Sequence, residues 1–577
     1  MASQPTKDLS SFKVYSEGTQ LPGTFNIIAI VIDRCINRIP WARLILKDGD
    51  PAAQDFKTSN TAEMEPGKTI KIEAGFHNQY EKIFEGIIIR QQIRMKNGKD
   101  SFLVIECKDK AYSTTLSRKS KYFIDSKDSD AIETIAGDYG LQKDIDSTSV
   151  THKQLVQCNC SDWDFMVNRS EMNGLVINCD DGKLVAKKPE VASSATTTIK
   201  FGTDVIDMDA HLDATHQYET VTCKGWSFSD QDITESDNDP LSITEAGDLT
   251  SSSLSGKVNG STITYFHSGK LSSDELKNWA TAQQTKNFLS KSRGIITTKG
   301  DFKAKPGGTV ELSGFGNHFN GKHFISGVRH ELRDSLWETT IQFGLCPELF
   351  TSQFDISNPP ASGIIAPVHG LQIGVVTALE GDPDSEFRIQ VKFPLMDNQA
   401  EGIWARVALL DAGSERGSFF MPEINDEVIV GFVNSDPRDA IVLGMLNSSV
   451  NAAPFTPSDD NNEKGFVTRS KMRIVFNDDK KTITIETPKG KKFILDDDDQ
   501  KKIILQDENN NKIEMSSDGI IIESCKDFKV KATGDMKGEG VNVEMKATAN
   551  FKGEGSGGAK LTSSGTTEVK GSFVNIN

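Results

Sequence analysis

The stretch TITIETPKGKKFILDDDDQKKIILQDENNNKIEMS, residues 482–516, carries a repeat that decides the fold of the C-terminal part of the chain. Two apolar residues spaced two positions apart recur every ten residues. The four pairs are Ile483 and Ile485, Phe493 and Leu495, Ile503 and Leu505, and Ile513 and Met515. A spacing of two places both side chains on one face of a β-strand. The repeat therefore predicts a stack of short strands with one apolar face.

This apolar face is too thin to be the core of a single chain. Each repeat offers it two apolar side chains, flanked by Lys, Asp and Glu. A fixed period with one apolar face is typical of β-solenoids, and three chains around a shared axis can bury such a face. We therefore predict that residues 465–577 form a triple-stranded, intertwined β-helix needle in a homotrimer, with the four pairs on its axis. A flat β-meander and a disordered low-complexity tail are the alternatives.

The region before the repeat has the pattern of a small barrel. Apolar and polar residues alternate from Phe387 to Phe393 and again from Val428 to Phe432. Several short strands within about 75 residues suit an OB-fold. The sequence therefore predicts an OB-fold at residues 370–446, between a proline-containing linker at 356–369 and a polar hinge at 447–464.

Residues 1–355 have the pattern of a mixed β region with a few helices. Ser161 lies three residues before Asp164, and Ser272 lies three residues before Glu275. Both spacings are typical of helix N-termini. The stretch 227–262 is rich in Ser, Thr, Asp and Asn, and we expect a long loop there.

Composition limits the function classes. The 577 residues carry a formal net charge of −17, which disfavours nonspecific binding to nucleic acids and anionic membranes. The eight cysteines are spread along a long chain, which is not the pattern of a disulfide-stabilised scaffold. The polar N-terminus has no apolar signal core, so we expect synthesis in the cytoplasm.

Four short motifs are candidates for chemical sites. Gly316 to Lys322 approaches a phosphate loop, but His323 follows instead of Ser or Thr, so a hairpin turn is favoured. His330-Glu331 begins like a zinc-protease motif but lacks the second histidine, and strand residues are expected.

The other two motifs are a cysteine pair and an acidic run. Cys158 and Cys160 would face one side of a strand, and Cys179 could join them as a third metal ligand. Since the sequence shows no clear fourth ligand, reduced buried thiols are the favoured interpretation and a zinc site is the alternative. Asp496 to Asp499 is expected to be a solvated turn rather than a cation site. No catalytic constellation is evident, and we predict no enzyme activity, no metal and no cofactor.

Taken in order, the motifs of this chain resemble one known family, the VgrG spike proteins of type VI secretion and the related spikes of extracellular contractile particles and phages. The segments that carry the resemblance are NRIPWARLILKDGD (37–50), SDWDFMVNRSEMNGLVI (161–177), PGGTVELSGFGNHFNGKHFISGVRHE (306–331), GLQIGVVTALEGDPDSEFRIQVKFP (370–394) and KGFVTRSKMRIVFNDDKKTITIETPKG (464–490).

The resemblance implies a fold and a role. Residues 1–355 would form a hub of two barrel-like domains that docks on a hexameric inner tube and on baseplate proteins. The needle would carry a separate PAAR-type tip protein, possible effectors would travel with it, and the spike would puncture the target envelope as part of a phage tail-like particle. The residues expected to seat the tip are Val574, Asn575, Ile576 and Asn577.

Departures from family variants refine this expectation. The chain ends directly after the repeat, so no fused effector is expected, and only a polar hinge separates the barrel from the needle, so no lysozyme-like domain is expected. The last histidine of the chain is His369, so the predicted needle contains none, which argues against a histidine–metal apex. The alternative function is a tail-associated carbohydrate-active β-helix enzyme, although the needle has no Trp or Tyr. The particular contractile system, the cargo and the target stay open.

Overall fold

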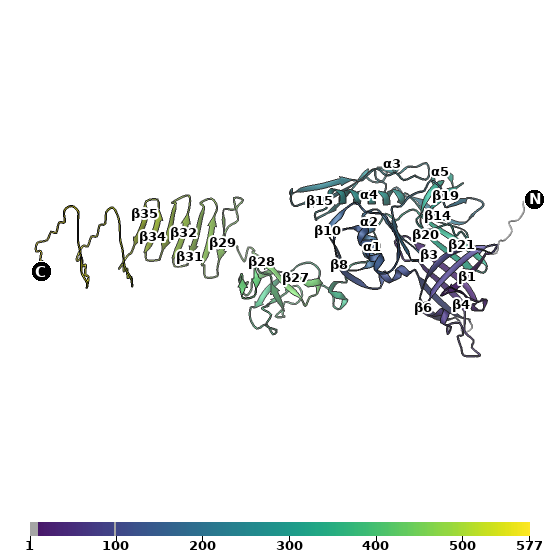
Figure 1. The fold of residues 1–577 in the computed structure, drawn as a ribbon, viewed down its shortest axis with the longest axis horizontal. Coiled ribbons are helices and arrows are strands. Elements are labelled where there is room, and N and C mark those ends of the chain that lie inside the picture. The colour runs from purple at the N-terminus through teal and green to yellow at the C-terminus, as the bar shows by residue number, and fades with distance from the viewer. Residues whose placement is uncertain (1–9, 97–99, 577) are drawn as a thin grey trace, which may run out of the picture. The chain divides into compact units, whose positions relative to one another are not determined.

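The computed structural model describes residues 10–96 and 100–576. The chain is mainly β, as predicted, and divides into two compact units, Met1–Pro367 and Val368–Asn577 (Figure 1). Within the described ranges, no helix combines the length and apolar character needed to cross a membrane.

One large sheet organises the first unit. Its order is β14-β18-β21-β20-β3-β4-β7-β6-β5-β1-β2, and β13 and β19 are attached beside β20. The strands are β1 (Ser10–Ser16), β2 (Thr19–Gln20), β3 (Ile27–Cys35), β4 (Trp41–Lys47), β5 (Thr69–Phe76), β6 (Gln79–Lys96), β7 (Asp100–Lys108), β13 (Thr197–Lys200), β14 (Val205–Leu212), β18 (Ser292–Lys299), β19 (Thr309–Ser313), β20 (Gly321–Arg333) and β21 (Leu336–Phe343).

The two halves of this sheet have separate cores. Alternating residues such as Ile32 and Leu44 fill the core beside β1–β7, and Val328 and Ile341 belong to the core beside β13–β21. Strand β20 pairs antiparallel with β3 from Gly327 onward. The two barrel-like halves of the predicted hub are therefore joined along one continuous sheet.

A first α/β subdomain is inserted after β7. Its helices pack on short sheets around buried residues such as Ile132 and Met166. Ser161 accepts a hydrogen bond from the backbone N–H of Asp164, so the predicted helix start is confirmed. The elements are β8 (Arg118–Lys127), α1 (Asp128–Asp138), β9 (Gln142–Ile145), β10 (Thr151–Ser161), α2 (Asp162–Met172), β11 (Val176–Asp180) and β12 (Lys183–Lys187).

A second α/β subdomain packs a long helix on a three-stranded sheet. Ser272 and Glu275 form the predicted capping box at the start of this helix. The expectation of a continuous loop at 227–262 is wrong in part, because a strand and a short helix lie within it. The elements are β15 (Thr220–Ser227), β16 (Asp232–Asp237), α3 (Ser251–Leu254), β17 (Thr262–His267) and α4 (Ser273–Ser290); α5 (Gly316–Phe319) and α6 (Phe350–Gln353) follow later in the unit.

The second unit begins with a closed five-stranded barrel in the order β22-β23-β24-β28-β27. Val391 and Val430 are fully buried in its core, as the alternation predicts. Phe387 breaks the pattern, because it lies outside the strand and is 87% exposed. The strands are β22 (Gln372–Ala378), β23 (Ile389–Lys392), β24 (Ile403–Val407), β27 (Glu427–Phe432) and β28 (Ala440–Met445), and β25 (Ala412–Gly413) and β26 (Arg416–Gly417) form a small hairpin.

The repeat forms a seven-stranded antiparallel meander in which each strand pairs with its sequence neighbours. Within one chain, the meander alternative therefore describes this stretch, and the later residues follow a different course described below. The strands are β29 (Glu463–Val467), β30 (Arg473–Asn477), β31 (Thr482–Glu486), β32 (Lys492–Asp496), β33 (Lys502–Gln506), β34 (Lys512–Ser516) and β35 (Gly519–Glu523).

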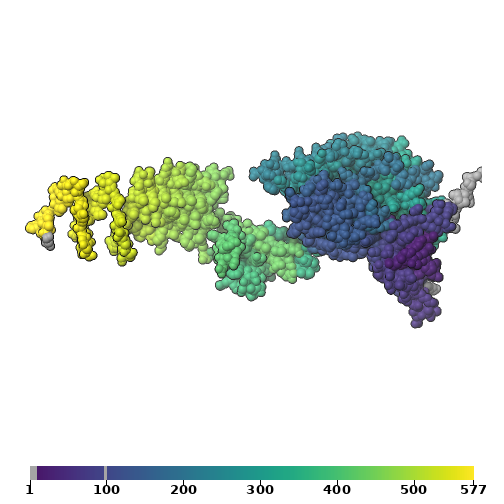
Figure 2. Space-filling view, viewed as in Figure 1, coloured from purple at the N-terminus to yellow at the C-terminus, as the bar shows by residue number. Residues whose placement is uncertain are grey.

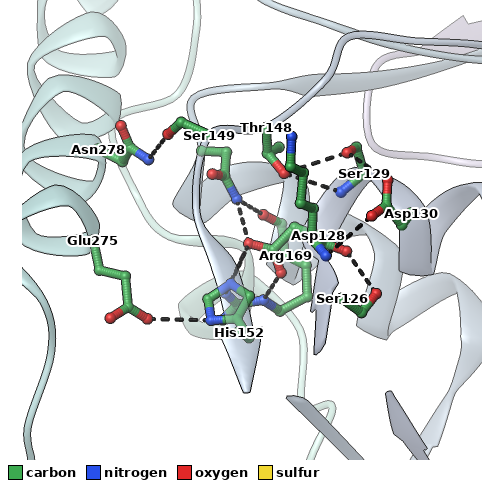
Figure 3. A network of polar contacts seen from close by, with 12 residues as sticks. Ser126, Asp128, Ser129, Asp130, Thr148, Ser149, His152, Arg169, Glu275 and Asn278 are labelled. Atoms are coloured by element: carbon green, nitrogen blue, oxygen red, sulfur yellow. Dashed lines mark hydrogen bonds and ion pairs between the residues drawn. The ribbon is translucent and has the colours of Figure 1, made fainter. Parts of the chain in front are cut away.

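A buried ionic network ties the two α/β subdomains together (Figure 3). Arg169 on α2 contacts both carboxylate oxygens of Asp128 at 2.6 and 3.0 Å, and Asn173 donates to the same carboxylate at 2.8 Å. His152 on β10 lies 3.0 Å from Asp128 through Nε2 and 3.3 Å from Glu275 of α4 through Nδ1. The network therefore links α1, α2, β10 and α4.

We expect Asp128→Ala to lower the free energy of unfolding of the first unit by about 3 kcal/mol, because Arg169 loses its buried partner. Burial raises the pKa of Asp128, but the hydrogen bonds and charge of Arg169 prevail and hold it below the ordinary value. The contribution is therefore complete above the ordinary carboxyl pKa and is lost as the pH falls through the lowered folded-state value.

Calorimetry of the wild type, Asp128→Ala and Asp138→Ala at neutral and acid pH checks this expectation. Asp138 lies on the same helix but is half-exposed, 3.6 Å from Lys121, so its removal should leave the melting temperature unchanged. Equal melting temperatures for all three proteins at neutral pH would contradict the assigned role of Asp128.

Candidate functional site: the apolar face of the repeat

The strand register brings all eight predicted axis residues together in two columns on one face of the meander. Antiparallel pairing aligns the first column as Ile483, Leu495, Ile503 and Met515. The second column is Ile485, Phe493, Leu505 and Ile513. Side chains directly opposite each other on neighbouring strands are in contact distance, so the columns form a continuous apolar strip. We call this strip the apolar face.

The apolar face has no cover within the described part of the chain. Ile485, Phe493, Leu505 and Met515 are between 36% and 52% exposed. Monomeric proteins rarely expose a contiguous apolar surface of this kind, and such surfaces usually mark contacts with other chains. The geometry therefore offers an interface but shows no partner. The assignment of these residues to a trimer axis stays a prediction.

The opposite face of the meander has a different character. Ile504 is only 6% exposed, and Glu514, its neighbour on β34, forms ion pairs with Lys502 and Lys512. Hydrogen bonds from these lysines lower the pKa of Glu514 below its ordinary value. The long charged side chains cover a central apolar column and keep their charges in water. This face is therefore complete without a partner.

Further cross-strand ion pairs line the edges of the meander. Arg473 lies 2.5 Å from Glu486, Lys481 lies 3.0 Å from Asp498, and Lys491 lies 2.7 Å from Glu508. These pairs are exposed and each contributes little stability. Together with Glu514 and its lysines, they make one face of the sheet charged and suited to solvent, whereas the apolar face is suited to contact with another apolar surface.

Sequence reasoning missed part of this strip. Ile474 pairs with Ile485 and Phe476 pairs with Ile483, so β30 extends both columns. The signal was present as two apolar residues spaced two apart, but they precede the next pair by nine residues instead of ten. Ile520 pairs with Met515 and Ile522 pairs with Ile513, so β35 also extends both columns.

Beyond β35 the chain makes no regular structure of its own. The described residues from 524 to 576 contain neither helix nor strand, and they are exposed throughout. Figure 2 shows them as thin, separate turns (yellow) after the solid meander. The backbone groups of this segment therefore have no strand pairing within the described chain.

The predicted tip-protein seat lies at the end of that segment. Val574, Asn575 and Ile576 are exposed. Asn577 lies outside the described residues. The seat therefore stays a prediction.

Two motifs of the first unit are structural. The stretch from Gly316 to Lys322 connects the antiparallel strands β19 and β20, which confirms the hairpin, and helix α5 forms a turn within the connection. His330 is buried in β20, where burial lowers its pKa to about 3 and Thr339 lies 2.9 Å from its Nδ1. Neither motif forms a phosphate or zinc site.

The cysteine motif does not have the expected strand geometry. Cys158 is exposed and Cys160 is half-buried, because a bulge with Asn159 at φ 42° interrupts the strand. The expectation that both face one side is therefore wrong. Across residues 10–96 and 100–576, no group of three or more His, Cys, Asp or Glu side chains is arranged to hold a metal ion. Asp496 accepts hydrogen bonds from the backbone of Asp498 and Asp499, so the acidic run is a turn, as expected.

Three family models match the chain in succession. The Alg8 N-terminal domain matches residues 6–334, which is more than half of the chain. The type VI secretion system/phage-baseplate injector OB domain matches residues 372–446, and the phage baseplate V C-terminal trimerisation domain matches residues 482–549. The second match coincides with the closed barrel, and the third covers the apolar face.

Curated relatives match shorter stretches. The type VI secretion system spike protein VgrG1a of Pseudomonas aeruginosa is 26% identical over 208 residues, which are 34% of this chain and 31% of that protein. The spike protein VgrG3 of Vibrio cholerae is 35% identical over 99 residues, 16% of this chain and 10% of that protein. The chain thus spans less than a third of the length of these relatives.

Solved structures of tail and secretion proteins share only low similarity. A 43 kDa tail protein of prophage MuSo2 from Shewanella oneidensis has a TM-score of 0.43 at 12% identity, covering 59% of this chain and 98% of its own. The E. coli c3393 protein, described as a type VI secretion component, has a TM-score of 0.39 at 12% identity, covering 75% and 100%. These scores are too low to support a conclusion about fold or function.

The family models therefore identify the chain, and their order agrees with the order of its hub sheet, barrel and repeat. The chain belongs to the Alg8 N-terminal domain family and, with its injector OB and trimerisation domains, to the VgrG-like spike proteins of contractile injection systems.

Proposed function

We propose that three copies of the chain form the central spike of a contractile injection machine and that the protein is a structural piercing component rather than an enzyme. The observation that carries the proposal is the apolar face, which one chain leaves open and which lies within the matched trimerisation domain. Three such faces turned toward a common axis would bury the apolar strip and leave the ion-paired faces in water.

The proposal assigns a role to each segment. Residues 1–355 cap the hexameric inner tube and contact baseplate proteins, 356–369 is a linker, 370–446 is the OB joint, 447–464 is a hinge, and 465–577 is the needle. The order of the family matches supports this assignment.

Contacts between the barrel and the start of the meander support a firm joint at this point of the second unit. Glu423, before β27, lies 2.7 Å from Arg469, and Phe420 stacks on Phe466 of β29 with ring centroids 5.3 Å apart. The ion pair is exposed and contributes little, so the stacked aromatic pair is the main contact that holds the start of the meander to the barrel. Under axial force, such a joint would transmit load from the barrel to the needle.

The finer parts of the proposal concern the partners and the location. A PAAR-type tip protein would sit on Val574, Asn575, Ile576 and Asn577, and effectors would travel with the spike. The protein would be made in the cytoplasm and become part of a phage tail-like particle that is ejected or extracellular on firing. The names of the curated relatives as secretion spike proteins support this placement.

The carbohydrate-active β-helix enzyme is the weaker candidate. An enzyme of that class would need aromatic platforms and an acidic pair along the needle. The needle sequence contains no Trp or Tyr, and its apolar face is built from aliphatic residues and phenylalanine.

The solution mass tests the proposed spike. We expect light scattering on a sizing column to give about three times the chain mass of 63.3 kDa for the full-length protein. A variant that ends at Asn462, before β29, loses the apolar face and is expected to have a smaller mass or a concentration-dependent one. A stable, folded monomer of the full-length chain would refute the proposal.

Ile503→Asp tests the register of the apolar face. We expect loss of the trimer, because three carboxylates would meet on one axis without partners. Ser517→Asp is the matched control, since it adds the same charge in the exposed turn between β34 and β35 and should keep the trimer mass. An intact trimer with unchanged melting for Ile503→Asp would show that this side chain does not face the axis.

A further inference from the structure

The barrel has an outer groove that the spike proposal does not use. It crosses β24 and is bounded by the β22–β23 connection, the β27–β28 connection and the segment around the β25–β26 hairpin. We call it the β24 groove. Its aromatic and apolar lining includes Phe387, Trp404, Phe419, Met421 and Ile441.

The strand pattern explains why side chains gather there. Ala405 is fully buried in the barrel core, so its neighbours Trp404 and Arg406 point outward. Trp404 pairs with Gln390 of β23, and Arg406 pairs with Ile441 of β28. In OB-folds, the face of the second and third strands, with the loops after the first and fourth strands, binds oligonucleotides and oligosaccharides. The β24 groove shares with this position the third strand and the two connections, but its strand residues come from β24 and β28 and none comes from β23.

Phe387 is held in the groove by a rigid loop. It is 87% exposed and has a φ of 56°, which is unfavourable for a residue with a side chain. The Asp382 carboxylate accepts hydrogen bonds from the backbone N–H groups of Glu386 at 2.8 Å and Arg388 at 3.2 Å, and it contacts the Arg388 guanidinium at 2.5 Å. These contacts also lower the pKa of Asp382, so the loop keeps its form at neutral pH. The aromatic ring is therefore fixed in advance in an exposed position.

The balance of charges in the β24 groove indicates which class of polymer it could bind. Its lining is balanced, with the arginines Arg388, Arg406, Arg416 and Arg438 and the carboxylates Glu386, Asp411, Glu415 and Asp439. Arg416 is bound by Asp411 at 2.9 Å, and Arg438 is bound by Asp436 at 2.6 Å. A nucleic acid needs excess positive charge to neutralise its phosphates, and this groove has none.

We infer that the β24 groove is a binding site for a neutral oligosaccharide. Sugar rings have apolar faces that stack on aromatic rings, here the exposed Phe387 and Phe419 and the half-buried Trp404. Their hydroxyl groups both donate and accept hydrogen bonds. The paired arginines and carboxylates of the rim present donors and acceptors side by side without net charge. The site lies on the barrel alone, so this inference does not depend on the spike proposal.

Calorimetric titration of the full-length protein with N-acetylchitohexaose, a neutral β-linked hexasaccharide, tests the site. Cellohexaose and a hexathymidylate are the comparison ligands. We expect saturable binding of one or both sugars with a Kd of about 1 mM or tighter, and none of the oligonucleotide. Phe387→Ala and Trp404→Ala should each weaken binding roughly tenfold.

Phe266→Ala is the matched control, because Phe266 is an equally exposed aromatic residue on β17 of the first unit. It should bind sugar like the wild type, and all variants should keep the wild-type mass by light scattering. The inference is overturned if neither sugar binds at millimolar concentration or if Phe387→Ala and Trp404→Ala bind normally. It is also overturned if the oligonucleotide competes, or if the two variants change the oligomeric mass, since the groove would then serve nucleic acid or another copy of the chain.

Discussion

Alternation along an extended strand forces every second side chain to the same side of a sheet, and in β31–β34 those side chains are apolar on a surface that no other part of the described chain covers. Covering the remaining exposed area of the eight residues would contribute on the order of 5–10 kcal/mol per chain before the entropy of association is subtracted. That gain is similar in size to the whole free energy of unfolding of a typical domain, which is about 5–15 kcal/mol. In the proposed trimer, the core of this region would therefore exist only between chains.

The two parts of the needle depend on partners in different ways. In β29–β35 the backbone hydrogen bonds are made within one chain, so an assembled needle would gain mainly side-chain packing there. Residues 524–576 make no strand pairs of their own, so they would also need backbone partners from other chains. The first part can thus align three chains, and the second can fold only after they are aligned. Apolar residues then recur every eight residues instead of ten, at Ile520, Phe528 and Met536, and this shorter spacing begins where the strands end.

Features that depend on residues close together in the sequence, such as helix caps and apolar repeats, were predicted well. Ser161 and Ser272 cap helices where the spacing predicted, and the ten-residue repeat gave the strands and the contact face of the needle. Two of the failures share a cause, because they occur where one side chain overrides the local pattern. Phe387 continues an apolar alternation but is turned outward by the Asp382 loop, and Asn159 in a left-handed conformation breaks the strand between two cysteines.

The pairing of strands far apart in the sequence was the property least predictable from it, because nothing in the sequence of β3 indicates that β20 is its neighbour. That pairing joins Cys35 to Gly327, so the central strand of the hub sheet must wait for a partner made almost three hundred residues later. At ribosomal rates of about 5–20 residues per second, the wait lasts roughly 15 seconds to one minute. During that time the apolar side of β3 and its open edge need protection. Synthesis of the hub is thus a period of exposure to misassociation with neighbouring nascent chains, whereas the meander, with partners about ten residues apart, closes as it emerges.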